Sequence, residues 1–233
     1  MNRIELIRKI IEDKKYSTYL EIGIHRGTSF FPVQCQNKIA VDPYMKVSWK
    51  GKIHRIFQNP YNLKNRYFEI TSDEFFDAKA PKIFQKSGVD IVFIDGLHTF
   101  EASLKDVLNS LQYLNNNGSI IMHDCYPPHK AAATPAASFH DAKGMKVNGW
   151  TGQWCGDVWK TVVYLKEKYS HNLDVRVLNA DFGLGIINVK TSIDSKLEID
   201  KDLYQKVNSL KYESVFSNPQ QNIGLKEPQE LHV

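Results

Sequence analysis

The stretch Tyr19–Ser29 constrains the fold of this chain more than any other part of the sequence. It reads Tyr-Leu-Glu-Ile-Gly-Ile-His-Arg-Gly-Thr-Ser, an apolar strand that runs into a turn with two glycines. A strand-to-helix turn that lets a ligand approach the backbone needs residues without a Cβ, and Gly23 and Gly27 supply them. The pattern predicts an α/β domain with a ligand-binding loop, although such glycines also serve as plain turn residues.

A carboxylate follows where a nucleoside-binding sheet requires one. Residues 38–42 read as a second short strand that ends in Asp42. In such sheets an acid about 20 residues after the first glycine accepts hydrogen bonds from ribose hydroxyls. A dinucleotide-binding loop would read Gly-x-Gly-x-x-Gly, whereas this loop reads Gly-x-x-x-Gly and is preceded by Glu21. Because a carboxylate there would repel a pyrophosphate, the loop favours a cationic ligand.

These residues resemble motifs I and II of class I S-adenosylmethionine-dependent methyltransferases. The resemblance implies an α/β fold with a Rossmann-like, seven-stranded, mostly parallel sheet, a terminal antiparallel hairpin and helices on both faces. It implies S-adenosyl-L-methionine as the cofactor, with Ser72 near the adenine. The cofactor-binding residues that it implies are Glu21, Gly23, Gly27, Thr28, Asp42, Ser72 and Asp95.

Titratable side chains follow two further predicted strands. The strand at residues 89–95 is apolar on both faces, which is typical of a central parallel strand, and it leads through Asp95 to His98. The strand at 119–124 ends in His123 and Asp124. Because neighbouring parallel strands lie about 5 Å apart, we expect these four side chains to converge beside the cofactor.

This combination resembles small-molecule O-methyltransferases, among them macrocin-type sugar methyltransferases and cephalosporin-hydroxylase-like proteins. In the sugar enzymes three acids hold Mg²⁺, and a histidine three residues after the first acid is the general base. The resemblance implies Asp95 and Asp124 as metal ligands and His98 as the base. His123 replaces the third acid, which would suit Mn²⁺ or another softer ion better than Mg²⁺. A purely structural role for His123 and Asp124 also stays open.

The acceptor that these groups favour is a hydroxyl, because a sugar hydroxyl is a poor nucleophile that needs a base, whereas an amine needs less help. A sugar or nucleotide sugar is the expected partner. Residues 125–156 form a long connection that leaves the second strand end, and we predict a lid over the acceptor site. Trp150 and Trp154 near its end would either stack on a sugar or anchor the lid.

Length and composition predict one cytoplasmic domain. With 233 residues, the chain is expected to form a methyltransferase domain at 1–215 and a flexible tail at 216–233. A net charge of +4 without an evident basic block predicts no nucleic-acid partner. No apolar run approaches the roughly 18 residues of a membrane span, so no membrane partner is expected. Three cysteines without metal-finger spacing agree with reduced thiols. A homo-oligomer is compatible with the sequence.

Two other functions stay open. The first is an NAD(P)-dependent oxidoreductase on a Rossmann sheet, which the missing third glycine and a predicted hairpin at 173–189 disfavour. The second is a catalytically silent nucleoside-binding domain, which would not need His98, His123 and Asp124. Amphipathic helices are predicted at 3–14 and 158–169, the latter capped by Asp157.

Overall fold

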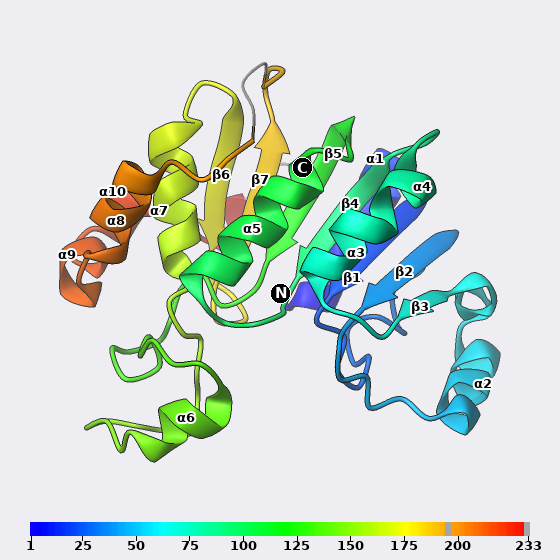
Figure 1. Ribbon diagram of the computed structural model, residues 1–233, viewed down its shortest axis with the longest axis horizontal. Coiled ribbons are helices and arrows are strands. Elements are labelled where there is room, and N and C mark those ends of the chain that lie inside the picture. The colour runs from blue at the N-terminus through cyan, green and yellow to red at the C-terminus, as the bar shows by residue number, and fades with distance from the viewer. Residues whose placement is uncertain (194–196, 231–233) are drawn as a thin grey trace.

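A mixed eight-stranded sheet forms the centre of the molecule, in the order β3-β2-β1-β4-β5-β7-β6-β8 (Figure 1). The computed structural model describes residues 1–193 and 197–230. Its strands are β1 (Thr18–Ile22), β2 (Asn37–Val41), β3 (Arg66–Phe68), β4 (Val89–Ile94), β5 (Leu114–Met122), β6 (Leu173–Leu178), β7 (Leu184–Val189) and β8 (Leu225–Lys226). The five strands β3, β2, β1, β4 and β5, in their order in the sheet, are all parallel. Strand β7 runs antiparallel to both of its neighbours, β5 and β6. The predicted Rossmann-like sheet and its terminal hairpin are confirmed, and β8 is an additional edge strand.

The order of the strands creates a binding edge. From β1 the chain adds β2 and β3 on one side of the sheet, and then β4 and β5 on the other. Parallel pairing of β1 with both β2 and β4 brings the ends of all three strands to the same edge. Open α/β sheets bind ligands outside the strand ends where the order reverses.

Helices cover both faces because strand side chains alternate between the faces. The helices are α1 (Arg3–Lys14), α2 (Trp49–Gln58), α3 (Ser72–Ala78), α4 (Ala80–Phe84), α5 (Phe100–Leu111), α6 (Phe139–Gly144), α7 (Trp159–Lys168), α8 (Lys201–Asn208), α9 (Tyr212–Phe216) and α10 (Pro219–Asn222), with short 3₁₀ turns η1 (Pro60–Lys64) and η2 (Pro228–Glu230). One apolar core packs α1 against Tyr19, Phe93 and Ile121. The other packs α3, α4, α5 and α7 against the alternate residues Leu20, Val92 and Ile120. No helix among the described residues is long and apolar enough to cross a bilayer.

Local capping accounts for where α1 begins and ends. The side chain of Asn2 accepts from the amides of Ile4 and Glu5, and Glu5 bonds back to the Asn2 amide. This reciprocal pair satisfies amides that a helix start would otherwise leave free. Lys15 adopts a left-handed conformation and ends the helix. The predicted helix at 3–14 is confirmed.

The predicted cap of α7 is wrong. Val158 precedes this helix without a side-chain cap. The carboxylate of Asp157 instead accepts from the amide of Phe100, 2.7 Å away, and pairs with Lys160 at 3.1 Å. Asp157 therefore joins the start of α5 to α7, a contact between segments that local sequence does not reveal.

The chain beyond residue 216 packs on the sheet edge. Ile223 is fully buried, and β8 pairs in parallel with β6. This differs from the flexible tail that polar composition suggests for 216–233, because a few apolar residues are enough to anchor such a segment. Residues 231–233 of that prediction lie outside the described residues.

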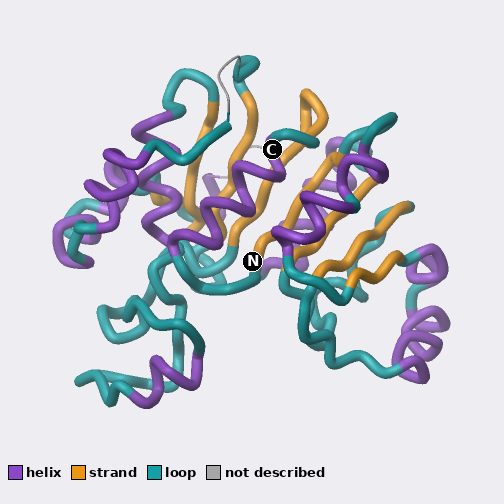
Figure 2. Tube along the Cα trace, viewed as in Figure 1, coloured by secondary structure: helices purple, strands orange, loops and turns teal. Residues whose placement is uncertain are grey.

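Two long segments project from the binding edge of the sheet. One follows β2 and carries α2, and the other follows β5 and carries α6 (Figure 1). Figure 2 shows the two segments on opposite sides: the one with α6 is mainly loop, whereas the one with α2 contains two helical parts. The edge between them is the place to look for a site.

Candidate active site

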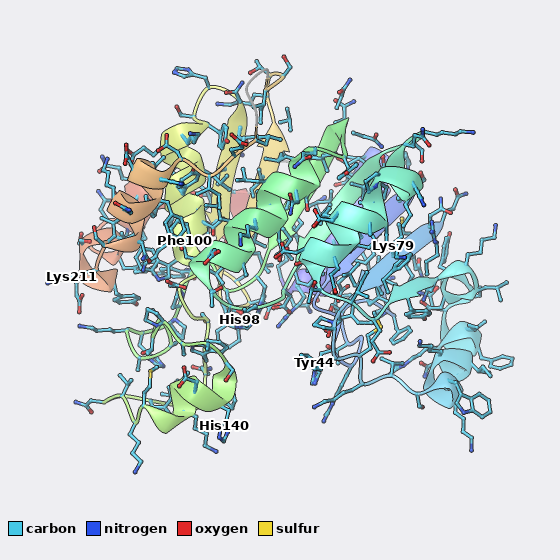
Figure 3. The ribbon with its side chains drawn as sticks, viewed as in Figure 1. Tyr44, Lys79, His98, Phe100, His140 and Lys211 are labelled. Atoms are coloured by element: carbon cyan, nitrogen blue, oxygen red, sulfur yellow. The ribbon has the colours of Figure 1, made fainter. Side chains whose placement is uncertain are left out.

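A cavity of about 850 Å³ opens at the ends of β1, β2, β4 and β5. Its wall includes eight of the ten residues predicted for the site: Gly23, Thr28, Asp42, Ser72, Asp95, His98, His123 and Asp124. Figure 3 shows His98 and Tyr44 near this edge of the sheet. Glu21 and Gly27 are not among the residues that line the cavity.

Gly23 permits the closest backbone approach in this loop. Its φ is +88°, and a Cβ built there would lie 2.1 Å from the carbonyl oxygen of Asp95. Its amide donates to the carbonyl of Val41 at 2.8 Å. Gly23 thus draws the ends of β1, β2 and β4 together beneath the cavity, because no side chain fits at its position.

Glu21 lies fully buried beside the loop. Its carboxylate accepts hydrogen bonds from the hydroxyls of Tyr19 and Ser29. Burial raises its pKa to about 7, although those two hydrogen bonds oppose the rise. Gly27, with φ +70°, has no room for a Cβ because the ring of Phe31 lies against it. Both residues shape the loop, and their direct contact with a cofactor stays a prediction.

Asp42 holds two loops at the cavity. Its carboxylate accepts from the amide of His25 at 2.7 Å and from the amide of Tyr44 at 2.6 Å. Each oxygen of a carboxylate has two lone pairs, so one on each oxygen remains for a ligand. Asp42 can therefore fix the wall and still accept from a pair of hydroxyls.

The four predicted side chains after β4 and β5 do converge. Nε2 of His98 lies 3.4 Å from Oδ1 of Asp95, and its Nδ1 lies 3.2 Å from Oδ2 of Asp124. Nδ1 of His123 lies 3.3 Å from Asp95 and 3.1 Å from Asp124. Asp124 adopts a left-handed conformation with φ +61°, which directs its carboxylate back toward the two imidazoles. Such strained residues are concentrated at functional sites.

Two residues that the sequence does not single out complete this cluster. The guanidinium of Arg3 pairs with Asp95 at 2.8 Å and with Asp181 at 2.9 Å. Asp181 also lies 3.5 Å from Nε2 of His123. Arg3 begins α1 and Asp181 follows β6, so only the assembled fold joins them. No local pattern at either position signals a site.

Three carboxylates and three basic groups balance one another in this cluster. Burial lowers the pKa of His98 and His123, but the carboxylates outweigh it and raise both, that of His123 to about 11. Burial raises the pKa of Asp95, and the two imidazoles outweigh it and bring that pKa well below its usual range. The charges cancel when both imidazoles are protonated alongside Arg3.

The cluster also fits a divalent cation. Donor atoms of Asp95, His98 and Asp124 all lie within 4.8 Å of one another. Nδ1 of His123 and Oδ2 of Asp124 are buried, and neither has a well-directed hydrogen bond within the described part of the chain. Imidazole and carboxylate donors suit Mn²⁺, Fe²⁺ or Zn²⁺. This set contains His98 in place of the His123 that the sequence suggests, although Nδ1 of His123 lies equally near both carboxylates.

Trp154 covers His98, and Trp150 does not reach it. The indole of Trp154 stacks on the imidazole of His98 with ring centroids 5.1 Å apart. The backbone carbonyl oxygen of Trp154 lies 3.2 Å from Nδ1 of His98. Trp150 packs on Phe139 within the projecting segment. Trp159 is buried in the core. Of the two tryptophans whose role the sequence leaves open, Trp154 belongs to the cavity wall.

Asp106 is a buried carboxyl on the cavity wall that the sequence analysis misses. Burial raises its pKa to about 7, against an opposing hydrogen bond from Ser72, and its Oδ1 has no hydrogen-bond partner among the described residues. A protonated carboxyl offers a ligand both a donor and an acceptor. The sequence signal that could have identified Asp106 is a row of polar residues on the buried face of α5, formed by Ser103, Asp106 and Ser110.

Comparison with known proteins relates this geometry to methyltransferases. Residues 20–125 match the model of a family described as a methyltransferase domain. The match covers the half of the sheet that carries most of the cavity wall. The matched residues run from β1 to the end of β5 and so include Asp42, His98 and Asp124. No curated protein matches the chain significantly in sequence.

Solved structures of methyltransferases share the fold of this chain. The SAH-bound methyltransferase PaMTH1 of Podospora anserina has a TM-score of 0.54 at 17% identity, with 81% of this chain and 78% of that one covered. An O-methyltransferase from Bacillus cereus, in complex with SAH, has 0.54 at 11% identity, with 80% of each chain covered. TomG of Streptomyces achromogenes, in complex with SAM, has 0.54 at 9%, with 81% and 80% covered.

The predicted Rossmann-like methyltransferase fold is confirmed, and residues 20–125 are similar to a methyltransferase domain. The oxidoreductase alternative is not favoured, since the family match does not point to it and β7 runs antiparallel to β5 where a dinucleotide-binding sheet continues with parallel strands. The narrower resemblance to macrocin-type and cephalosporin-hydroxylase-like proteins stays a prediction.

Proposed function

We propose that this methyltransferase domain transfers a methyl group from S-adenosyl-L-methionine to a hydroxyl oxygen of a small molecule, with a sugar hydroxyl as the favoured acceptor. The observation that carries the proposal is one cavity with Asp42 after β2 and His98 after β4. The first is a ribose-binding carboxylate and the second a base. Neighbours in complex with SAM or SAH support the choice of methyl donor.

The chemistry asked of the chain is alignment and proton removal. A sulfonium activates its methyl group for in-line displacement, so the protein has to orient the acceptor and accept its proton. His98 takes that role because its ring lies at the cavity wall. Asp95 and Asp124 on either side of the ring would stabilise the imidazolium that forms. Trp154 shields the ring from water on one side.

Asp95 and Asp124 would hold a divalent cation in this scheme, together with one of the two histidines. Such an ion would acidify the acceptor hydroxyl and offset the carboxylate charge that raises the pKa of His98. If His123 is the ligand, His98 remains available as the base. If His98 is the ligand, the hydroxyl loses its proton to another group. Turnover with Mg²⁺, Mn²⁺ or chelator in His98→Gln and His123→Gln variants separates these assignments.

Calorimetric titration with S-adenosylhomocysteine tests the cofactor. We expect micromolar binding that falls at least tenfold in Asp42→Ala, because the two hydroxyl contacts are lost. Asp13→Ala is the matched control, since Asp13 is an exposed carboxylate on α1 that pairs with Lys9. Binding of NADH with no response to S-adenosylhomocysteine would contradict the proposal.

Turnover on nucleotide sugars tests the acceptor and the base. His98→Gln should keep cofactor affinity and lose about 10²–10⁴-fold in kcat, the usual contribution of a general base. Undiminished turnover in that variant would show that His98 is not the base. Cofactor binding with no turnover on any acceptor, in the presence or absence of metal, would favour the silent nucleoside-binding domain.

A further inference from the structure

Helix α2 exposes an apolar face to solvent. None of its residues is buried, and the exposed Trp49, Ile53 and Phe57 follow one another at four-residue spacing, which places them on one side of a helix. Tyr61 and Leu63 on the adjoining η1 are also exposed. These five residues, called the α2 patch below, make up five of the eleven large apolar side chains exposed among the described residues. Phe57 is 84% exposed and Trp49 is 68% exposed.

The same segment carries the positive charge of the chain. Residues 43–68 contain six Lys and Arg and no Asp or Glu. The other residues hold 24 basic and 26 acidic side chains, a net charge of −2, against +4 for the whole chain. The expectation that the chain has no basic block is therefore wrong for residues 43–68. Lys46, Lys50, Lys64 and Arg66 are exposed around the patch.

Cation–π contacts hold α2 to the domain on its other side. Nζ of Lys52 lies 3.9 Å from the ring centroid of Tyr67, and the Arg55 guanidinium lies 5.5 Å from that of Phe31. The backbone carbonyl of Arg55 accepts from the side chain of Asn62 at 2.9 Å. These contacts fix the helix with its apolar side outward, so burial in this chain's own core does not account for the patch.

We propose that α2 and η1 form a docking surface for an anionic lipid bilayer. A short helix with Trp, Ile and Phe on one side and lysines around them inserts its apolar side at the level of the headgroups, and anionic lipids attract its cations. Each Lys or Arg near such a surface adds to this attraction. A second copy of this chain fits the patch poorly, because a two-fold contact would bring the four exposed cations of one copy against the same four of the other.

The segment that carries the docking surface also contributes to the cavity wall. Tyr44 lines the cavity and is 78% exposed, and it lies between Asp42 and α2 in the chain. On the other side of the edge, the segment with α6 exposes Phe139 and Met145. Figure 3 shows Tyr44 and His140 on these two segments, below the sheet. A bilayer in contact with α2 would therefore lie close to the cavity mouth. This surface is independent of the proposed methyl transfer.

Co-sedimentation of the full chain with vesicles tests the proposal. We expect binding to vesicles of phosphatidylcholine and phosphatidylglycerol in equal parts, weaker binding at higher salt, and little binding to phosphatidylcholine alone. The Trp49→Ser/Phe57→Ser variant should bind at least tenfold more weakly. Because both side chains are exposed, it should keep the thermal stability and S-adenosylhomocysteine response of the parent, which confirms that it is folded.

A charge-matched pair of variants separates a local surface from general attraction. Lys50→Glu/Lys64→Glu changes the charge beside the patch, and Lys79→Glu/Lys82→Glu makes the same change at exposed positions around α4. The first should lose at least tenfold in vesicle affinity, and the second less than threefold. Equal losses, unchanged binding in Trp49→Ser/Phe57→Ser, or no binding to anionic vesicles would overturn the proposal. A dimer in sedimentation velocity that Trp49→Ser/Phe57→Ser abolishes would assign the patch to a second copy instead.

Discussion

Gly23 sits where the first and fourth strand ends meet, and it tolerates no side chain. We predict that Gly23→Ala lowers the free energy of unfolding by about 2–4 kcal/mol, because the new Cβ collides with backbone and the φ of +88° is strained for alanine. Urea unfolding measures this. Gly144→Ala is the control, since a Cβ there meets nothing within 4 Å. An equal effect of the two substitutions would contradict the argument.

Asp106 should make stability depend on pH. Its folded pKa of about 7 is above the ordinary 3.8, so the folded state binds the extra proton between those values. Stability from this group is therefore present at low pH and falls as pH rises, by up to about 1.4 kcal/mol per pH unit. Asp106→Asn should gain stability relative to the parent between pH 5 and pH 8, measured by urea unfolding at both. Parallel curves for the two proteins would contradict the prediction.

At the scale of elements, most of the sheet could be predicted from the sequence. Apolar runs at β1, β4 and β5 and titratable residues at their ends indicate parallel strands with a site beyond them, and His98 and Asp124 do meet there. Arg3 and Asp181 could not be predicted, because they lie 178 residues apart and their pairing depends on how α1 packs. Glu21 is visible in the sequence as an acid within an apolar strand. The face of the sheet that its side chain occupies could not be predicted, because apolar side chains line both faces of a buried strand.

The docking of α1 depends on Arg3, which links the helix to Asp95 and Asp181. Arg3→Ala leaves two carboxylates without their cation, and we predict a loss of about 2–3 kcal/mol in unfolding free energy, less than for a fully buried pair because Arg3 keeps 27% exposure. Thermal or urea unfolding would show it. Arg8→Ala, on the exposed side of the same helix, should change stability by less than about 0.5 kcal/mol. If the two variants behaved alike, the bridge would not hold α1.

For the whole molecule, the segment beyond residue 216 protects an edge of the sheet. The amides of Val177 and Asn179 in β6 donate to carbonyls in that segment. Ile223, which belongs to the segment, is fully buried. We predict that a chain ending at residue 216 loses roughly 3–5 kcal/mol of stability, from the burial of Ile223 and Leu225. It should also aggregate through the bared edge of β6. Unfolding and light scattering measure both, and Ile223→Ala should reproduce part of the stability loss without the aggregation. A shortened chain as stable as the parent would contradict this.

The bridge through Arg3 also sets an order of events during translation. Asp95 leaves the ribosome 92 residues after Arg3, and Asp181 leaves it 178 residues after Arg3. The glycine loop and Asp42 can thus be synthesised with the first parallel strands, whereas the charge cluster cannot form until Asp181 has emerged. In a nascent chain, the residues proposed to bind the cofactor would therefore be in place before the residues proposed to carry out the reaction. The capacity to bind would precede the capacity to react.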